Sequence, residues 1–470
     1  MAITMNRNAG ADLSTVADPY AVRSDAAMRE IAETVLAYAT KIGATDCAVD
    51  VDEGAGLTVN VRKGRVETIE QNRDKGVGVT IYLGQADAVR RGNASTSDFS
   101  TQALSKTVAA AYDIARFTAA DNAAALPDDA WYERAPRDFD LYHPWNIDAE
   151  TAVEIGRRAE AAAFGTSPLI KNSDGASISL QQGRFISANS RGFIGGYPHS
   201  RHSISVAPIA KHGRDGMQRD DWYVSMRDPA DLPAPEAIGR YAAERTLARL
   251  GARQLTTRTV PVLFEAPLAV GLLGSFTQAA SGGSLYRNSS FLIGKLDTRV
   301  FAGHIDVVDN PFIMKAMGSA SFDEDGVMTQ KRKVVDAGVV TGWFLSTYSA
   351  RKMGMTPTGN GGGSHNLSLT SRLTRRDDDF IAMLKKLDTG LLVTDLMGQG
   401  VNTLTGDYSR GATGFWVENG VIAYPVEEIT IAGNLLDMFA KIVAVGADTL
   451  TRGNKTTGSI LIEAMTVAGN

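Results

Sequence analysis

The chain alternates between two patterns of hydrophobic and polar positions. From Ser24 to Ala39, apolar residues recur at helical spacing, and Ser24 is a suitable N-cap, so this segment is predicted to be a helix. The pattern then changes to a period of two over residues 48–95, which predicts an antiparallel meander. Its expected turns are at Gly54–Gly56, Lys63–Gly64 and Asp74–Gly76.

The same two patterns divide the rest of the chain. They predict helices at Thr101–Arg116, Ala149–Phe164 and Pro235–Leu250, and a second β-rich block at Ile170–Arg227. The strand-like run Val260–Glu265 precedes a helix that starts just after Pro267 and stops at Gly282–Gly283. Asp336-Ala337-Gly338 and Asn419–Gly420 predict tight hairpin turns, and the last apolar segment, 459–469, predicts a closing strand. We therefore expect four regions: a flexible leader at 1–22, an N-terminal α/β domain at 23–118, a connector and β-rich middle region at 119–234, and a β-rich C-terminal domain at 235–470.

Composition narrows the class of protein. The net charge of −5 gives no reason to expect nucleic acid or an anionic membrane as a partner. No run of about 18 apolar residues is present, so no membrane span is expected. The single cysteine and the absence of a signal-peptide core at the N-terminus favour a cytoplasmic location.

Several blocks in the second half resemble one protein family. They are the helix and Gly-rich exit at Gly271–Asn288 and the segments Asp323–Val327, Ser346–Met355, Thr358–Asn366 and Asn402–Gly420. The chain is similar in these blocks to the TldD/PmbA family. The resemblance implies an α+β fold with an α/β N-terminal part, a β-rich middle region and a large β-rich C-terminal domain.

The family resemblance also bears on metal binding. TldD-type metallopeptidases carry an H-E-x-x-x-H zinc signature in the helix and a cysteine ligand near the C-terminus. Between Gly271 and Gly283 this chain has neither histidine nor glutamate; it offers Ser275, Thr277 and Gln278, which are poor zinc ligands. The segment Tyr408–Phe415 has no thiol, and the one cysteine, Cys47, is far away in sequence. The chain therefore resembles the zinc-free PmbA (TldE) branch, and no catalytic residue, metal ligand or cofactor is assigned to it.

Candidate substrate-binding residues come from the family-like blocks. Arginine can bind a carboxylate with two hydrogen bonds, and tyrosine combines an apolar ring with a polar tip. The candidates are Tyr286, Arg287, His365, Asp407, Tyr408 and Arg410. The same residue types are also enriched at subunit interfaces, and Asp407–Arg410 could equally be a structural turn.

A Gly-rich run, an acidic run and a pair of histidines could each have a structural role instead of a binding role. The Gly-rich run Gly359–Gly363 could offer N–H groups to an anion, or it could allow a close chain crossing that tolerates no Cβ atom. The acidic run Asp323–Asp325 is most simply a solvated turn. His199 and His202, three apart in a predicted strand, should face opposite sides and cannot share one metal.

The resemblance implies a function. It indicates the non-catalytic subunit of a cytoplasmic TldD/TldE-type complex, in which a TldD-like subunit holds the zinc and the complex cleaves short or unfolded peptides. The family's older label, modulator of DNA gyrase, implies only an indirect link to DNA. Two alternatives stay open: a metallopeptidase with a metal site of another kind, and a stand-alone homodimeric peptide-binding protein.

Overall fold

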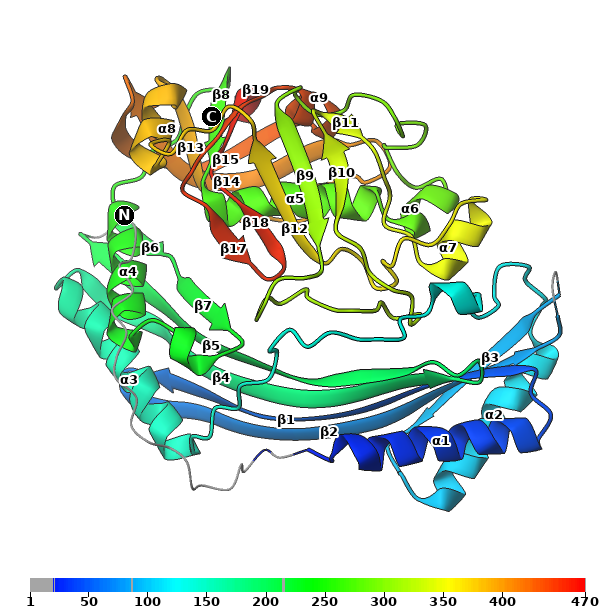
Figure 1. The fold of residues 1–470 in the computed structure, drawn as a ribbon. Coiled ribbons are helices and arrows are strands. Elements are labelled where there is room, and N and C mark those ends of the chain that lie inside the picture. The colour runs from blue at the N-terminus through cyan, green and yellow to red at the C-terminus, as the bar shows by residue number, and fades with distance from the viewer. Residues whose placement is uncertain (1–19, 21, 86–87, 214–215, 470) are drawn as a thin grey trace.

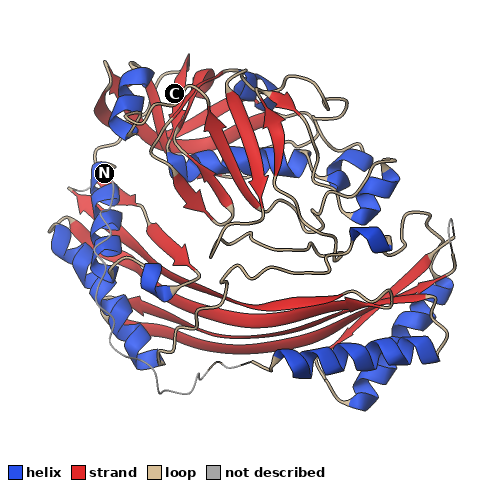
Figure 2. Cartoon of the chain, viewed as in Figure 1, coloured by secondary structure: helices blue, strands red, loops and turns tan. Residues whose placement is uncertain are grey.

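A long curved sheet carries a second, β-rich body on its concave side (Figures 1 and 2). The computed structural model describes residues 20, 22–85, 88–213 and 216–469. Helices and strands are both abundant in these ranges, so the predicted α+β class is confirmed. Of the predicted leader, only Tyr20 and Val22 are described, and Tyr20 is buried against the first sheet's core. The proposed domain boundaries stay a prediction.

The first sheet joins strands from the predicted N-terminal and middle regions. Its strands are β1 (Asp46–Arg62), β2 (Arg65–Leu83), β3 (Arg90–Thr96), β4 (Ile170–Asn189), β5 (Ile194–His212), β6 (Gly216–Arg219) and β7 (Trp222–Met226). The order is β3-β2-β1-β4-β5-β6, with β7 also paired to β5, and every pairing is antiparallel. Because β1 pairs with β4, the two regions share one sheet.

Four helices cover the convex face of this sheet (Figure 2). They are α1 (Asp25–Lys41), α2 (Thr101–Phe117), α3 (Ala149–Thr166) and α4 (Pro235–Ala248). All four match the predicted helices, and the Ser24 hydroxyl accepts a hydrogen bond from the backbone N–H of Ala27, as an N-cap does. Alternate β1 residues such as Val49 and Val51 are buried under α1 and α2, which leaves the intervening polar residues for the concave face.

Two of the predicted turns are wrong. Only Lys63–Gly64 is a turn; β1 runs through Gly54–Gly56 and β2 runs through Asp74–Gly76 without interruption. The glycines serve close packing across strands instead. A Cβ atom on Gly56 would overlap the side chain of Gln181, and one on Gly76 would lie 3.0 Å from Asp52 Oδ1.

The C-terminal body contains two six-stranded sheets with a helix between them. One sheet has the order β11-β10-β9-β12-β18-β17 and the other has the order β15-β14-β13-β8-β19-β16. The strands of the first are β9 (Ile305–Asn310), β10 (Arg332–Asp336), β11 (Val339–Val340), β12 (Asn366–Ser371), β17 (Leu450–Arg452) and β18 (Lys455–Thr457). Those of the second are β8 (Arg258–Phe264), β13 (Gly390–Met397), β14 (Asp407–Glu418), β15 (Val421–Asn434), β16 (Ile442–Val445) and β19 (Ile460–Ala468).

Helix α5 (Ala266–Ala279) lies in the core that these two sheets share. Its residues Leu272 and Phe276 belong to one apolar cluster with residues of both sheets. The predicted helix is thus confirmed, but Gly282 begins a further short helix instead of a loop. The shorter helices are α6 (Gly282–Tyr286), α7 (Thr347–Lys352), α8 (Phe380–Leu387) and α9 (Leu435–Ala440), with single 3₁₀ turns at Asp129–Trp131 and Pro229–Asp231 in the connecting segments.

The predicted hairpins are present in the C-terminal body. Asn419 and Gly420 join β14 to β15 with φ angles of 49° and 75°, as a type I′ turn requires. Ala337 and Gly338, at φ 47° and 80°, join β10 to β11. The predicted closing strand is β19, which pairs with β8 and β16.

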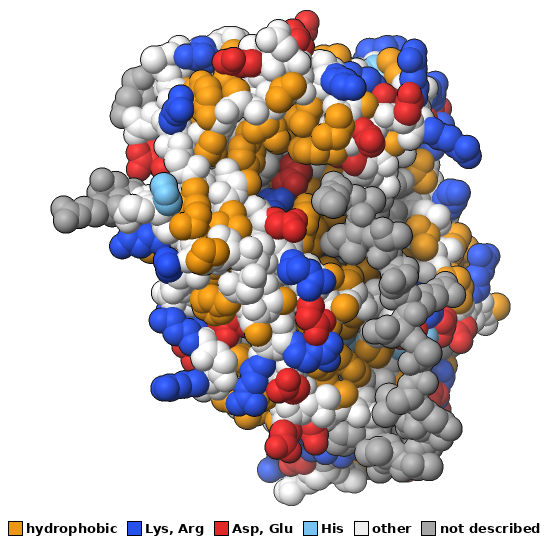
Figure 3. Space-filling model, turned by 90° about the vertical axis from the view of Figure 1, so that its left-hand side faces the viewer, with side chains coloured by type: hydrophobic (Ala, Val, Ile, Leu, Met, Phe, Trp, Pro, Cys, Tyr) orange, Lys and Arg blue, Asp and Glu red, His pale blue; other side chains and the backbone are white. Residues whose placement is uncertain are grey.

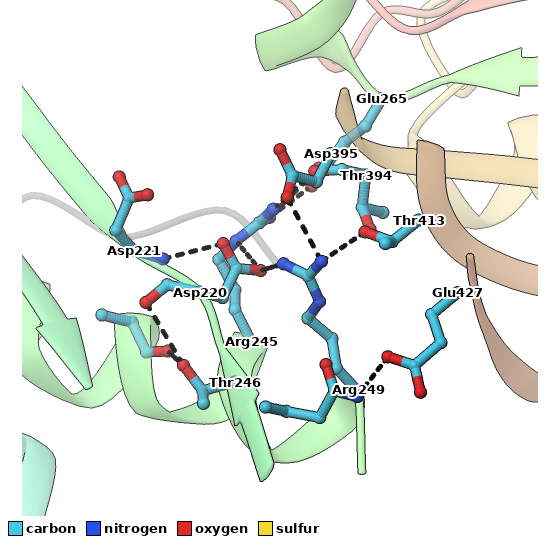
Figure 4. A network of polar contacts seen from close by, with 12 residues as sticks. Asp220, Asp221, Arg245, Thr246, Arg249, Glu265, Thr394, Asp395, Thr413 and Glu427 are labelled. Atoms are coloured by element: carbon cyan, nitrogen blue, oxygen red, sulfur yellow. Dashed lines mark hydrogen bonds and ion pairs between the residues drawn. The ribbon is translucent and has the colours of Figure 1, made fainter. Parts of the chain in front are cut away.

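Polar networks attach the C-terminal body to both ends of the first sheet. At one end, Arg245 of α4 and Arg249, the residue that follows α4, contact Asp220, Glu265, Asp395 and Thr413 (Figure 4). At the other end, Tyr348 and Lys352 of α7 donate to Asp121, each at 2.8 Å. Near the second attachment, loops of the C-terminal body lie over part of the concave face.

Candidate functional site

A cavity of ≈ 720 Å³ lies between the concave face of the first sheet and loops of the C-terminal body. Its volume is in the range typical of ligand pockets. The sheet contributes Asp50, Tyr82, Arg91, Phe185, Ser187 and Asn189 to its lining. The C-terminal body contributes Asp323–Asp325, Thr347, Tyr348, Gly361–His365 and Asn454.

The acidic loop at Asp323–Asp325 forms one wall of the cavity. Asp323 is 5% exposed and accepts hydrogen bonds from the backbone N–H groups of Asp325, Val327 and Gly361, at 2.9, 3.0 and 2.7 Å. The expectation of a solvated turn is therefore wrong for Asp323. The loop folds inward because three backbone donors and the opposite chain segment surround this carboxyl.

Burial, and after it the charges of neighbouring carboxyl groups, raise several pKa values in the cavity. Burial, followed by the charge of Asp325, raises the pKa of Asp323 to about 8, although its three N–H donors act in the opposite direction. Burial also raises the pKa of Asp50 across the cavity, where Asp52 and Asp325 add to the effect and the hydroxyl of Ser187 opposes it. Burial and the charges of Asp325 and Asp50 raise the pKa of Glu324. The two walls of the cavity thus place carboxyl groups close enough to repel one another.

The Gly-rich run fits the interpretation as a close chain crossing. A Cβ atom on Gly359, which has a φ of 70°, would overlap the carbonyl oxygen of Met328, and one on Gly362 would contact Glu324. The N–H of Gly361 already donates to Asp323. The run therefore packs against the acidic loop and holds it in place. Of the two interpretations of this run, the contacts favour the close chain crossing over the anion site.

His365 is the one predicted site residue that lines the cavity itself. Its ring nitrogens lie 3.2 Å from the carbonyl oxygen of Gly318 and 2.7 Å from that of Gly359, and its backbone N–H donates to Asp309. Because both nitrogens face carbonyl oxygens, the ring is oriented by the backbone around it.

Tyr286 and Arg287 lie next to the cavity. The ring of Tyr286 meets that of Tyr348, a lining residue, edge to face at 5.7 Å. The exposed guanidinium of Arg287 lies over the Tyr286 ring, 5.1 Å from its centroid. These two residues extend from the edge of the cavity toward solvent.

The other three predicted residues lie on β14, away from the cavity lining. Asp407 is exposed, and hydrogen bonds from Thr405 and Asn434 lower its pKa. Tyr408 is 3% exposed, and burial in the core raises its pKa to about 12. Arg410 is half-buried and reaches the carbonyl oxygen of Leu396 at 3.5 Å. The structure thus divides the predicted residues into a cavity group and a β14 group, and their binding roles stay predictions.

The chain's geometry around α5 bears on metal binding. The hydroxyls of Ser275 and Thr277 donate to carbonyl oxygens of their own helix, those of Gly271 and Leu273. Cys47 lies in the core of the first sheet, where burial raises its pKa to about 12. Within residues 20, 22–85, 88–213 and 216–469, no group of three or more His, Cys, Asp or Glu side chains is arranged to hold a metal ion.

Asp50, Tyr82, Asp323 and Asp325 were not predicted as site residues. The segment containing Asp323 was recognised as family-like, but nothing local indicated that its carboxyl turns inward. Asp50 lies at a polar position of an alternating strand, which favours a solvent-facing side chain. Only the covering of the concave face by a distant part of the chain makes this position part of a cavity. His199 and His202 lie on β5 as expected, with His202 buried and its Nε2 2.8 Å from the carbonyl oxygen of His143.

The described residues on the face that Figure 3 draws show no continuous basic patch of the kind that binds nucleic acid. On the face in Figure 3, Lys and Arg side chains are interspersed with Asp and Glu. Within the part of the chain that the structure describes, no helix is long and apolar enough to span a membrane.

Comparison with known proteins assigns this fold to a metallopeptidase family. Models of the PmbA/TldA metallopeptidase match in three parts: domain 1 at residues 47–115, the central domain at 142–250 and the C-terminal domain at 257–469. The chain belongs to the PmbA/TldD family.

Relatives and solved structures agree with this assignment. The chain is 43% identical to metalloprotease PmbA of Escherichia coli O157:H7, over 94% of this chain and 97% of that protein. It is 40% identical to a PmbA homologue of Haemophilus influenzae, over 94% and 96%. A candidate modulator of DNA gyrase from Bacteroides thetaiotaomicron has a similar structure, with a TM-score of 0.88, 26% identity, and 95% and 100% of the chains covered. TldE from Thermococcus kodakarensis, at 19% identity, shares the fold with a TM-score of 0.81, over 93% and 100%.

Proposed function

We propose that this chain is the non-catalytic subunit of a two-subunit metallopeptidase, in which a TldD-like subunit holds the zinc and the complex cleaves short or unfolded peptides. The observation that carries the proposal is the exposed edge of α5. The more exposed positions along this edge are Gly271, Gly274, Ser275 and Gln278. None of these supplies the imidazole or carboxylate that a catalytic zinc requires.

The C-terminal strand supports the same proposal. Zinc-bearing members of the family take a cysteine ligand from the region that corresponds to Tyr408–Phe415. Here that segment lies on β14 and contains no cysteine, and Cys47 is buried in the other sheet. Two separate sources of ligands are thus replaced at once, and we assign zinc to the partner.

The chain's role in such a complex is to enclose the peptide. A folded protein cannot enter a closed chamber, so selection acts on access, and backbone pairing gives affinity without sequence preference. Hydrophobic side chains gather on the C-terminal body in the upper part of Figure 3. Its large exposed hydrophobic residues include Leu373, Ile381, Leu404, Val421 and Val443. Such residues suit a stable subunit interface, which typically buries upwards of about 2,000 Å². We place the complex in the cytoplasm.

The proposal is tested by reconstitution. The chain and a TldD-like protein from the same cells are purified separately, mixed, and measured by size-exclusion chromatography with light scattering and by cleavage of an unstructured peptide. We expect a heterodimer with higher peptidase activity than either protein alone. In the absence of the partner, the same surface can pair two copies of this chain as a homodimer. A chain that stays monomeric and leaves the partner's activity unchanged contradicts the proposal.

One observation favours a second candidate function. The relatives that are 43% and 40% identical are named metalloproteases in their own right. An active metallopeptidase would hold about one metal ion per chain and cleave peptides without a partner. Metal content and activity of the isolated chain separate the two candidates.

A further inference from the structure

Carboxyl groups on opposite walls of the cavity have no cationic partner among the residues that the structure describes. Asp50 projects from the sheet, and Asp323, Glu324 and Asp325 come from the loop of the C-terminal body. Among the described residues, none of these four forms an ion pair, although ion pairs are frequent elsewhere on the chain. Arg91 is the only Lys or Arg among the described lining residues, and its guanidinium lies over the Tyr348 ring.

Carboxyl groups that lie near one another without a cation disfavour their charged state, which costs free energy. Only Asp323 of the four is buried, so for exposed Asp50 and Glu324 the cost lies in holding like charges near one another. The repulsion is direct here, because the charge of Asp325 acts on Asp50, Asp323 and Glu324 alike. A bound cation would relieve this repulsion.

The walls also offer neutral polar and aromatic groups. Thr347 lines the cavity, is 5% exposed, and its Oγ1 has no hydrogen-bond partner in the described part of the structure. Tyr82, Phe185 and Tyr348 supply aromatic surface. A ligand for this space therefore has a positive group that donates hydrogen bonds and an apolar part next to it.

The arrangement suits an ammonium group better than a metal ion. A metal ion needs several ligands converging at 2.0–2.6 Å, and no such group of carboxylates is present among the described residues. An ammonium group donates three hydrogen bonds at longer distances and can bridge carboxylates on two walls. The volume of ≈ 720 Å³ accommodates more than the ammonium group alone.

We propose that this cavity binds the amino-terminal ammonium group of an unfolded peptide, held between Asp50 on the sheet and Glu324 and Asp325 on the loop. The aromatic residues then contact the first side chain of the peptide. This deepens the proposed function by naming the part of the substrate that this chain recognises, and it rests on the peptide substrate of that function. Binding to the isolated chain needs neither zinc nor a partner, so its failure is distinguishable from a failure of assembly.

The test is calorimetric titration of the full chain with three probes. They are Ala-Phe-Ala amide with a free amino terminus, its N-acetylated form, and N-acetyl-Lys-Phe-Ala amide, whose only ammonium group is on the side chain. We expect the free amino terminus to bind at least about tenfold more tightly than either acetylated probe, since a charge-assisted contact is lost in each. The double variant Asp50→Asn, Glu324→Gln should erase this difference.

The control is Asp113→Asn on α2, where the side chain is 68% exposed and outside the cavity. This variant should bind the three probes as the unchanged chain does. Equal binding of the free and acetylated peptides, equal binding of the lysine probe, no binding of any probe, or an unchanged preference in the double variant would each overturn the proposal.

Discussion

Arg245 donates two hydrogen bonds to the carboxylate of Glu265, at 2.8 and 3.1 Å, and so ties α4 to the residue that precedes α5. The two side chains are only 12% and 13% exposed. Burial opposes the charge on Arg245, but the carboxylates of Glu265 and Asp220 outweigh it and raise the pKa of its guanidinium. The position of α5 relative to the first sheet is therefore fixed by a nearly buried ion pair.

Arg245→Ala should destabilise the protein strongly. The substitution leaves Glu265 without its partner and Asp220 with Arg249 alone, and breaking a buried pair costs about 3–5 kcal/mol. Thermal unfolding should show a clear drop in Tm. The matched control is Arg219→Ala, which breaks an exposed pair with Asp174 and should change Tm little. Equal effects of the two substitutions would show that the buried pair has no special weight.

Stability should fall as pH rises through the range set by Asp323. The pKa of Asp323 is about 8 in the folded chain, whereas its ordinary value, which applies to the unfolded chain, is 3.8. Between these two pH values the folded state therefore holds more protons than the unfolded state. Stability then decreases with rising pH in this window, and the loss is complete above about pH 8. Asp323→Asn should flatten this dependence, whatever its effect on overall stability.

Melting curves at pH 5, 6.5 and 8 measure the effect. The quantity to compare is the change in Tm with pH, in the unchanged chain and in Asp323→Asn. Asp174→Asn, at an exposed site outside the cavity, serves as the control. An identical slope in the Asp323 variant would contradict the raised pKa.

Two glycine substitutions should act in opposite directions. Gly359→Ala places a Cβ atom against the carbonyl oxygen of Met328 at a φ of 70°, so it should destabilise the loop that carries His365 by at least about 1 kcal/mol. Gly271→Ala adds a methyl group in open space on α5 and should stabilise the chain by about 0.5–1 kcal/mol. Differential scanning calorimetry of both variants checks the signs. A destabilising Gly271→Ala would mean that this edge of α5 is in contact with something, such as a second subunit.

Arg410→Ala should weaken peptide turnover by the assembled complex. Arg410 lies on β14 beside the exposed Met397, which pairs with Gly411, in a segment predicted to bind peptide. If it binds peptide without taking part in bond cleavage, KM rises and kcat changes little. Zinc content and assembly should be normal. Arg116→Ala on α2, at an exposed site, is the control, and unchanged kinetics in Arg410→Ala would return this residue to a structural role.

The sequence predicted helices better than strand ends. Ser24 and the apolar spacing after it are local, and α1 begins where they indicate. Glycine favours turns in isolation, so Gly54–Gly56 and Asp74–Gly76 resemble turns in the sequence. In the fold, β1 pairs with β4 and β2 on its two sides, and β2 pairs with β1, so both segments stay extended. Gly56 makes room for Gln181, which is 125 positions away and invisible to a local pattern.

The candidate site was predicted only in part. Family-like blocks indicated His365 and Tyr286, which line or adjoin the cavity. The pairing of Asp50 with the loop at Asp323–Asp325 depends on the C-terminal body closing over the sheet. No periodicity encodes that contact, because it joins segments about 270 residues apart in the printed sequence.

The most direct test of the account is the zinc content and peptidase activity of the isolated chain after extensive dialysis. With Ser275 and Gln278 on the exposed edge of α5 and no cysteine on β14, we expect far less than one zinc ion per chain and no cleavage of an unstructured peptide. The same chain, mixed with its TldD-like partner, should form a complex in which the zinc belongs to the partner. About one tightly held zinc ion per isolated chain, with peptide cleavage that a chelator abolishes, would contradict the central claim.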